Sequence, residues 1–166
     1  LEFEPYESKL IVFSKRTLPS AAVTQAANLP APLDLARDWR RRFRLPVLAI
    51  TGSNGKTTTK EMLAAILRTQ GPTLATEGNL NNDIGVPLTL FRLGDEHRHA
   101  VIEMGANRPH DIADLVAIAE PTVALVTMVV PAHLEGFGDV RGVANAKGLV
   151  YSRLAADGVA VINADE

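Results

Sequence analysis

Short apolar runs alternate with amphipathic stretches along the chain from residue 46 onward. The runs are rich in valine, isoleucine, leucine and alanine, which predicts buried strands at 47–51, 73–76, 100–103, 123–129 and 159–162. The intervening stretches predict helices at 58–69, 85–93, 109–119 and 140–155. This alternation predicts an α/β fold, a parallel sheet with right-handed crossovers and helices on both faces. Ligands of such sheets bind beyond the carboxyl ends of the strands.

The helix predicted at 58–69 can be given an inward face from its apolar spacing. Its end is set by the Gly71-Pro72 pair, because proline cannot continue a helix. The side chains expected to point toward the core are Met62, Leu63, Ile66 and Leu67.

A further helix is predicted before the first strand. Asp34 can cap its N-terminus, and Leu35, Trp39 and Phe43 recur every four residues as an apolar stripe. Two alternatives remain for the arginines near its end: a solvated helix end favoured by the helix dipole, or a phosphate-binding patch. These arginines are Arg40, Arg41, Arg42 and Arg44.

Residues 1–32 are the least patterned part of the chain. The run 10–13 is compatible with a short strand and 21–27 with a short helix, while Pro19, Pro30 and Pro32 favour a linker. We therefore treat 1–32 as an unassigned N-terminal segment or linker. The first residue is not methionine and the start is acidic, so we expect no signal peptide and a fragment or a processed product.

Composition excludes several classes of function. The chain has 166 residues, of which 46% are apolar, so a packed core is expected and disorder is not. The net charge of −2 gives no electrostatic basis for binding nucleic acid or an anionic membrane. No apolar run is long enough to insert into a membrane. Cysteine is absent, which excludes disulfides, thiolate metal sites and cysteine nucleophiles, and fits a reducing, cytoplasmic setting.

The most informative segment follows the first predicted strand and reads ITGSNGKTTTK from residue 50 to residue 60. A glycine turn that opens a helix directs backbone N–H groups and the helix dipole at one point, which suits phosphate. Lys56 can reach terminal phosphates, and the hydroxyl of Thr57 can bind Mg²⁺. Ile50 stands where the usual phosphate loop has its first glycine. The alternative is an ordinary strand–helix turn with a solvated lysine.

Polar residues at the ends of other strands test this hypothesis. Glu103, followed by Met104-Gly105, ends the third strand, where a nucleotide enzyme holds Mg²⁺; a surface glutamate is the alternative. His133 follows the fourth strand, and Lys147 lies on a later helix. The alternative for His133 is a purely structural histidine, and the alternative for Lys147 is a solvated lysine. The asparagines in the loop 79–85 can be turn formers and helix caps.

Taken together, these segments resemble the Mur ligase family of ATP-dependent amide ligases. The loop at 51–58 (TGSNGKTT) resembles that family's ATP loop, which also lacks the first glycine. Four further strings resemble the branch that joins D-alanyl-D-alanine to UDP-N-acetylmuramoyl-tripeptide. They are 79–90 (NLNNDIGVPLTL), 103–107 (EMGAN), 131–138 (PAHLEGFG) and 146–148 (AKG).

The resemblance implies a role for each matching residue. Lys56 would neutralise the γ-phosphate, and Thr57 with Glu103 would hold one Mg²⁺. His133 and Lys147 would serve a second Mg²⁺, with Lys147 carbamylated by CO₂. The residue implied near the phosphates is Asn82. The residues implied to wrap the ATP phosphates are Gly52, Ser53, Asn54, Gly55, Lys56, Thr57 and Thr58.

The resemblance also implies a reaction and a domain plan. A substrate carboxylate would attack the γ-phosphate of ATP, and the amine of D-alanyl-D-alanine would then attack the acyl phosphate. Residues 33–166 would form part of the family's central ATP-binding domain, a phosphate-loop fold truncated at its C-terminal side. A sheet ending there would expose an unpaired strand edge, with a risk of association.

Departures from the family pattern keep alternatives open. Thr127-Met128 stand where asparagines are frequent, and Leu149 where an acidic residue is common. A sister amide ligase is one alternative, and a non-catalytic nucleotide-binding fragment is another. Because the family's amine site lies on a separate domain, we expect this chain alone to be unable to form the peptide bond.

Overall fold

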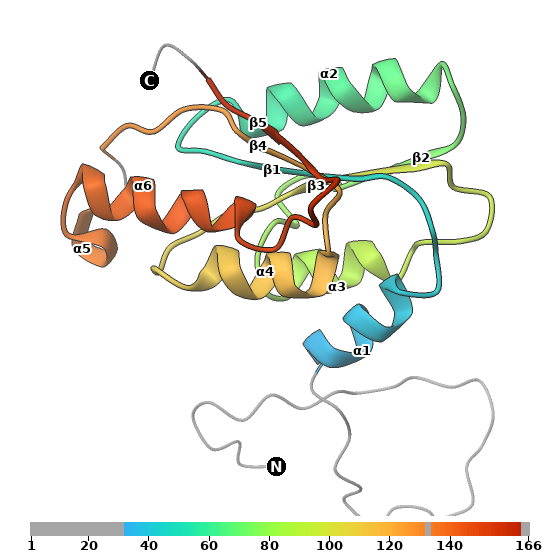
Figure 1. Cartoon of the computed structure of the whole chain (residues 1–166), viewed down its shortest axis with the longest axis horizontal. Coiled ribbons are helices and arrows are strands. Elements are labelled where there is room, and N and C mark those ends of the chain that lie inside the picture. Colours follow the sequence, from blue (N-terminus) through green and yellow to red (C-terminus); the bar gives the residue numbers. More distant parts are fainter. Residues whose placement is uncertain (1–31, 132–133, 164–166) are drawn as a thin grey trace, which may run out of the picture.

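A computed structural model describes residues 32–131 and 134–163 (Figure 1). The helices are α1 (Pro32–Arg40), α2 (Lys56–Arg68), α3 (Gly85–Leu90), α4 (Asp111–Ala119), α5 (Leu134–Phe137) and α6 (Val140–Gly148), with a 3₁₀ turn, η2, at Leu149–Tyr151. The strands are β1 (Val47–Thr51), β2 (Thr73–Ala75), β3 (His99–Glu103), β4 (Val123–Val126) and β5 (Val159–Val161). The elements predicted within residues 1–31 lie outside the described residues.

The strands form one parallel sheet in the order β2-β3-β1-β4-β5, which confirms the predicted fold class. β1 lies at the centre, with Val47 beside Ala100 of β3 and Leu48 beside Val123 of β4. Because all strands run the same way, their carboxyl ends meet at one edge of the sheet. The segments after β1, β3 and β4 therefore lie close together.

Helices cover both faces of the sheet (Figure 1). Among the described elements α2 is the helix on one face, where Ala64 meets Ile50, Ala75 and Val101 in a small core. The opposite face carries α3, α4 and α6 over a larger core of alternate strand residues and apolar helix residues. Strand residues buried on both faces explain the continuous apolar runs of the sequence.

The inward face predicted for α2 was partly wrong. Leu63 and Leu67 pack against the core, but the side chains of Met62 and Ile66 are 62% and 56% exposed. The residues fully buried in their place are Lys60 and Ala64. Ala64 allows the helix to approach the sheet closely, while the ammonium of Lys60 finds a hydrogen-bond partner inside.

The largest differences from the predicted elements lie after β3, in the C-terminal part of the chain. β4 ends at Val126 instead of residue 129. The N–H of Thr127 still bonds to Thr51 at the end of β1, but the carbonyl of Met128 accepts from Ser53 in the loop that follows β1. The last long helix ends at Gly148 and continues as η2. The short α5 was not predicted.

Helix α1 begins before the predicted cap. Pro32 occupies the first position, which suits proline because its missing N–H has no helical partner there. Asp34 instead lies within the first turn and accepts a hydrogen bond from Arg37 at 2.9 Å. Trp39 donates its indole N–H to the carbonyl of Leu93 at 3.3 Å and thereby joins α1 to the end of the α3 segment.

Three of the four arginines near the end of α1 have structural partners. Arg40 is buried and donates to the carbonyls of Ala119 and Phe43 at 2.9 and 2.6 Å. Arg41 pairs with Glu120, and the guanidinium of Arg42 lies 4.7 Å from the ring centre of Trp39. Burial lowers the pKa of Arg40, although the charge of Glu120 opposes this. These contacts favour the helix-end interpretation over a phosphate patch.

We expect Arg40→Met to lower the free energy of unfolding by about 1.5–3 kcal/mol, the range for hydrogen bonds to charged groups. The methionine keeps much of the side-chain volume but leaves the carbonyls at the end of α4 without this donor. Urea unfolding followed by circular dichroism measures the change. Arg41→Ala, which removes an exposed ion pair, is the control and should have a smaller effect. Equal losses of stability in both variants would contradict a structural role for the buried guanidinium of Arg40.

β5 forms one edge of the sheet. Among the described residues it pairs with β4 alone, and its three side chains are exposed. This agrees with the expected strand edge, and association through it stays a prediction. Within the described part of the chain, no helix combines the length and apolar character needed to cross a membrane.

Candidate functional site

The loop between β1 and α2 has the shape of a phosphate-binding turn. Gly52 and Gly55 adopt positive φ angles of 144° and 79°, which side chains disfavour, so glycine is needed at both positions. The helix then starts at Lys56, directly after Gly55. Its first backbone N–H groups and the positive end of its dipole point toward the loop.

Lys56 folds back over this loop. Its ammonium donates to the carbonyl of Gly52 at 2.9 Å and to that of Ser53 at 3.4 Å. The sequence predicted a lysine beside phosphates or a solvated lysine, and the structure places the ammonium against the loop backbone. A polyphosphate entering the loop would offer the ammonium stronger, charged acceptors in place of these carbonyls.

The carboxylate of Glu103 is buried at the end of β3, next to the start of α2. Its side chain is 1% exposed and accepts hydrogen bonds from Thr57 at 3.0 Å and Asn81 at 2.8 Å. The structure therefore brings together Thr57 and Glu103, which were predicted to share a cation, and adds Asn81. Among the described residues Glu103 forms no ion pair, so hydrogen bonds hold its buried carboxyl group beside the start of α2.

Hard oxygen donors of this kind suit Mg²⁺. The ion commonly uses one or two carboxylates together with water and substrate phosphates, so a carboxylate and a neighbouring hydroxyl are a sufficient protein contribution. No group of three or more acidic, histidine or cysteine side chains that would hold a metal by itself occurs in the described ranges. The residues present therefore fit a cation that binds together with a nucleotide.

Lys147 reaches the same site from α6. It is 3% exposed and lines a pocket of about 150 Å³ together with Lys56, Asn81 and the loop residues Gly52 and Ser53. Burial lowers the pKa of Lys147 to about 8, and the positive charge of Lys56 contributes to the same shift. The prediction of a solvated lysine on a helix is therefore wrong for Lys147.

The segment after β4 holds the loop in place, which the sequence did not reveal. The hydroxyl of Thr127 contacts the carbonyl of Asn54 at 2.6 Å and that of Thr51 at 3.2 Å. The backbone N–H of Ser53 donates to the carbonyl of Met128 at 2.8 Å, and the hydroxyl of Ser53 donates to the carbonyl of Val130. Thr127 was noted only as a departure from a family pattern, because the contact joins residues far apart in the chain.

Two asparagines in the loop before α3 make different contacts. Asn82 accepts hydrogen bonds from the N–H groups of Gly85 and Ile84 at 2.8 and 3.3 Å and so caps α3. It also lines a neighbouring pocket of about 380 Å³, bordered by Asn107. Asn81, which the sequence did not single out, is the asparagine that contacts Glu103. The role of Asn82 beside phosphates stays a prediction.

The remaining predicted residues are placed as follows. Thr58 is exposed in the first turn of α2, and Asn54 is exposed at the tip of the loop. His133 lies outside the described residues, so its role in binding a metal stays a prediction.

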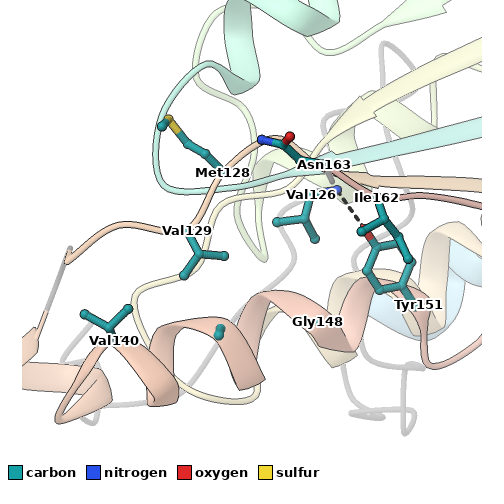
Figure 2. A pocket seen from close by; sticks show the side chains of 9 residues that line it. Val126, Met128, Val129, Val140, Gly148, Tyr151, Ile162 and Asn163 are labelled. Carbon is teal, nitrogen blue, oxygen red and sulfur yellow. Dashed lines mark hydrogen bonds between the residues drawn. The ribbon is translucent and has the colours of Figure 1, made fainter. Parts of the chain in front are cut away.

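An apolar pocket of about 550 Å³ lies beside the site, between the ends of β4 and β5 and helix α6 (Figure 2). Val126, Val129 and Val140 line it, as does the aromatic ring of Tyr151. The hydroxyl of Tyr151 accepts from the N–H of Val126 at 3.1 Å and donates to the carbonyl of Val161 at 2.8 Å. It thereby links the ends of the two strands.

The central β1, the glycine loop and the buried acidic residue at the end of the adjacent strand define a nucleotide-binding domain of the phosphate-loop class. Comparison with known proteins gives the family: the family model for the Mur ligase middle domain matches residues 50–166. The chain belongs to the Mur ligase family.

Two curated relatives are similar to this chain over most of its length. UDP-N-acetylmuramoyl-tripeptide--D-alanyl-D-alanine ligase from Escherichia coli (strain K12) is 54% identical over 132 residues, which cover 80% of this chain and 29% of the relative. The ligase of the same name from Haemophilus influenzae is 49% identical over 136 residues, covering 80% and 30%. The chain thus spans less than a third of the length of these relatives.

Solved structures give the same result for the fold. MurF from Acinetobacter baumannii superposes with a TM-score of 0.77 at 45% identity, over 79% of this chain and 29% of that one. MurF ligase from Thermotoga maritima, solved in complex with ADP, gives a TM-score of 0.76 at 37% identity, over 81% and 32%. The fold is that of the central domain of these ligases.

Proposed function

We propose that this chain forms the ATP- and Mg²⁺-binding domain of a ligase that joins D-alanyl-D-alanine to UDP-N-acetylmuramoyl-tripeptide. The observation that carries the proposal is the convergence of Lys56, Thr57, Glu103 and Lys147 at one edge of the sheet. The Thermotoga maritima relative was solved with ADP, which supports a nucleotide as the ligand.

Each residue has a part in the proposed site. The loop from Gly52 to Thr58 would surround the phosphates with backbone N–H groups, and Lys56 would neutralise charge on the γ-phosphate as it transfers. Thr57 and Glu103 would hold one Mg²⁺. When bound, the metal would supply charge neutralisation for the phosphates.

A second Mg²⁺ would use Lys147 and His133. An ammonium repels a cation, so Lys147 would have to become a carbamate, which carries a carboxylate-like charge. The low pKa of Lys147 supports this, because only the neutral amine reacts with CO₂ and burial makes that form accessible near neutral pH.

The proposed reaction proceeds in two steps in the whole enzyme. The terminal carboxylate of the tripeptide attacks the γ-phosphorus, the bond to the β-phosphate oxygen breaks, and ADP leaves. The amine of D-alanyl-D-alanine then attacks the acyl carbon, the acyl–phosphate bond breaks, and phosphate and a proton are released. The protein acts chiefly by positioning and charge neutralisation, as in other phosphoryl transfers.

We further propose the setting and extent of this domain. The reaction would occur in the cytoplasm, supply peptidoglycan precursor, and so support cell shape and cell division. The domain would span residues 33–166, with 1–32 as a preceding segment. The packing of α1 supports a start near residue 33, since Trp39 and Arg40 bond to the α3 and α4 segments.

The test is calorimetric titration of the chain with ATP and Mg²⁺. We expect Lys56→Ala to weaken binding by about 1.5–3 kcal/mol, the loss of charged hydrogen bonds, or roughly 10- to 150-fold in affinity. Arg68→Ala removes the same charge from the exposed last turn of α2 and should bind like the wild type. Absence of binding by the folded wild type, or full binding by Lys56→Ala, would contradict the proposal.

A further inference from the structure

Lys60 is a fully buried charged residue that none of the roles above explains. It lies on α2, three residues after Thr57, and its side chain is 0% exposed. Burying an ammonium is costly unless it is paired and hydrogen-bonded. An apolar side chain of similar volume would fill the same space more cheaply, so packing alone does not account for a lysine.

The ammonium of Lys60 has two partners. It donates to the backbone carbonyl of Thr76 at 2.8 Å, and it lies 2.6 Å from the carboxylate of Glu61. The hydrogen bond and charge of Lys60 lower the pKa of Glu61. The carboxylate of Glu61 is largely exposed, so the partner that Lys60 meets inside the protein is Thr76, the residue just after β2.

Thr76 also bonds to Glu103, so it connects Lys60 with that residue. Its hydroxyl accepts a hydrogen bond from the backbone N–H of Glu103 at 3.0 Å, and its own N–H donates to Val101 at 3.0 Å. Thr76 is itself 2% exposed. The N–H of Glu103 is therefore fixed by a side chain whose own backbone is fixed by Lys60.

Helix α2 thus holds Glu103 in two places. Thr57 contacts the carboxylate directly, and Lys60, on the same side of the helix, holds the backbone of the same residue through Thr76. Side chains three residues apart on a helix lie on one face, which allows both contacts at once. A shift of Thr76 would move the carboxylate away from Thr57.

We propose that Lys60 and Thr76 are positioning residues that orient the carboxylate of Glu103 toward the bound cation. The inference rests on the proposed function, because it presumes that Glu103 binds Mg²⁺ together with a nucleotide. Groups that orient a metal ligand commonly affect metal affinity by about 10- to 100-fold when removed. The contacts that hold Ser53 and Asn54 of the loop come from the segment after β4 and do not involve Lys60 or Thr76.

The first experiment measures the Mg²⁺ enhancement, the ratio of the ATP dissociation constant in EDTA to that in Mg²⁺. Thr76→Val removes the hydroxyl at constant shape and should reduce the enhancement by about 10- to 100-fold, with affinity in EDTA unchanged. Thr76→Ser keeps the hydroxyl and should retain most of it. Thr73→Val, at the start of β2, removes a hydroxyl that donates to the carbonyl of Gly71 and should leave the ratio unchanged.

A second experiment addresses Lys60 directly. The chain has no cysteine, so Lys60→Cys places a single thiol that can be aminoethylated in denaturant to restore a lysine-like side chain. After refolding, the aminoethylated protein should recover the Mg²⁺ enhancement that the unmodified Lys60→Cys variant lacks. Recovery of thermal stability without recovery of the ratio would show a merely structural role and overturn the proposal.

A readout without ligand separates this inference from the proposed function. Hydrogen exchange of the Glu103 amide should be faster in Thr76→Val than in Thr76→Ser, because the acceptor is lost. An unchanged enhancement in Thr76→Val would overturn the inference and leave the proposed function intact. A wild type that binds ATP with no enhancement would overturn the proposed Mg²⁺ role of Glu103, and the inference with it.

Discussion

Gly52→Ala is expected to abolish measurable ATP binding and to destabilise the fold. Gly52 has φ of 144°, a conformation that side chains rarely adopt and that costs about 1–3 kcal/mol when forced. A Cβ added at Gly52 would also fall on the hydroxyl oxygen of Thr127. That hydroxyl donates to the carbonyl of Asn54, so relief of the clash would displace the loop from the segment after β4.

Calorimetry with ATP and Mg²⁺, together with urea unfolding, measures both effects. Gly78→Ala is the matched control, because Gly78 also has a positive φ, of 53°, but a Cβ there meets nothing within 4 Å. It should cost about 1–2 kcal/mol of stability, the penalty for a left-handed residue, and leave ATP binding intact. Wild-type affinity in Gly52→Ala would show that the loop does not need its present shape.

Lys147 is expected to react with CO₂ to form a carbamate. Its pKa of about 8 lies far below the usual 10.5, chiefly because of burial and secondarily because of the charge on Lys56. At neutral pH the neutral amine is then about 300-fold more abundant than for a solvated lysine, since each pKa unit is a factor of ten. The amine nitrogen attacks the carbon of CO₂, a C–N bond forms, and one proton leaves.

Carbon-13 NMR under labelled CO₂ at fixed pressure detects this carbamate. The signal should grow as the pH is raised toward 8 and should be absent in Lys147→Met. Any α-amino group, whose pKa is near 8, gives a second signal that the variant retains and that serves as an internal reference. Lys56→Met should weaken the Lys147 signal, because loss of the neighbouring charge raises the pKa of Lys147. Identical spectra for wild type and Lys147→Met would contradict the prediction.

Much of the fold follows from the spacing of apolar residues, and helix α2 shows where this reasoning stops. The helix and its end were predicted, but of the four residues assigned to its inward face two, Met62 and Ile66, are exposed. Apolar character cannot identify Lys60 as a buried residue, because its burial depends on the carbonyl of Thr76, which folding brings near. A ranking of residues by hydrophobicity places lysine on the surface and therefore cannot predict the burial of Lys60.

The candidate site also contains residues that the sequence predicted and residues that it did not. The glycine loop and Glu103 were predictable, because each follows directly from its own strand and the strands of a parallel sheet end at one edge. Asn81 and Thr127 were not, since each acts on a residue more distant in the chain, Glu103 and Asn54 respectively. Such contacts depend on how loops close over the sheet edge, for which the local sequence holds no signal.

The central position of β1 has a consequence for how the binding site is acquired. β1 is flanked by β3 and β4, both from later in the chain, so the strand that carries the phosphate loop has no hydrogen-bonded neighbour close in sequence. Closing such long loops precedes any gain from pairing, which makes folding slow. The loop should therefore take its binding shape only with the final assembly of the sheet, and nucleotide affinity should appear late and all at once during refolding.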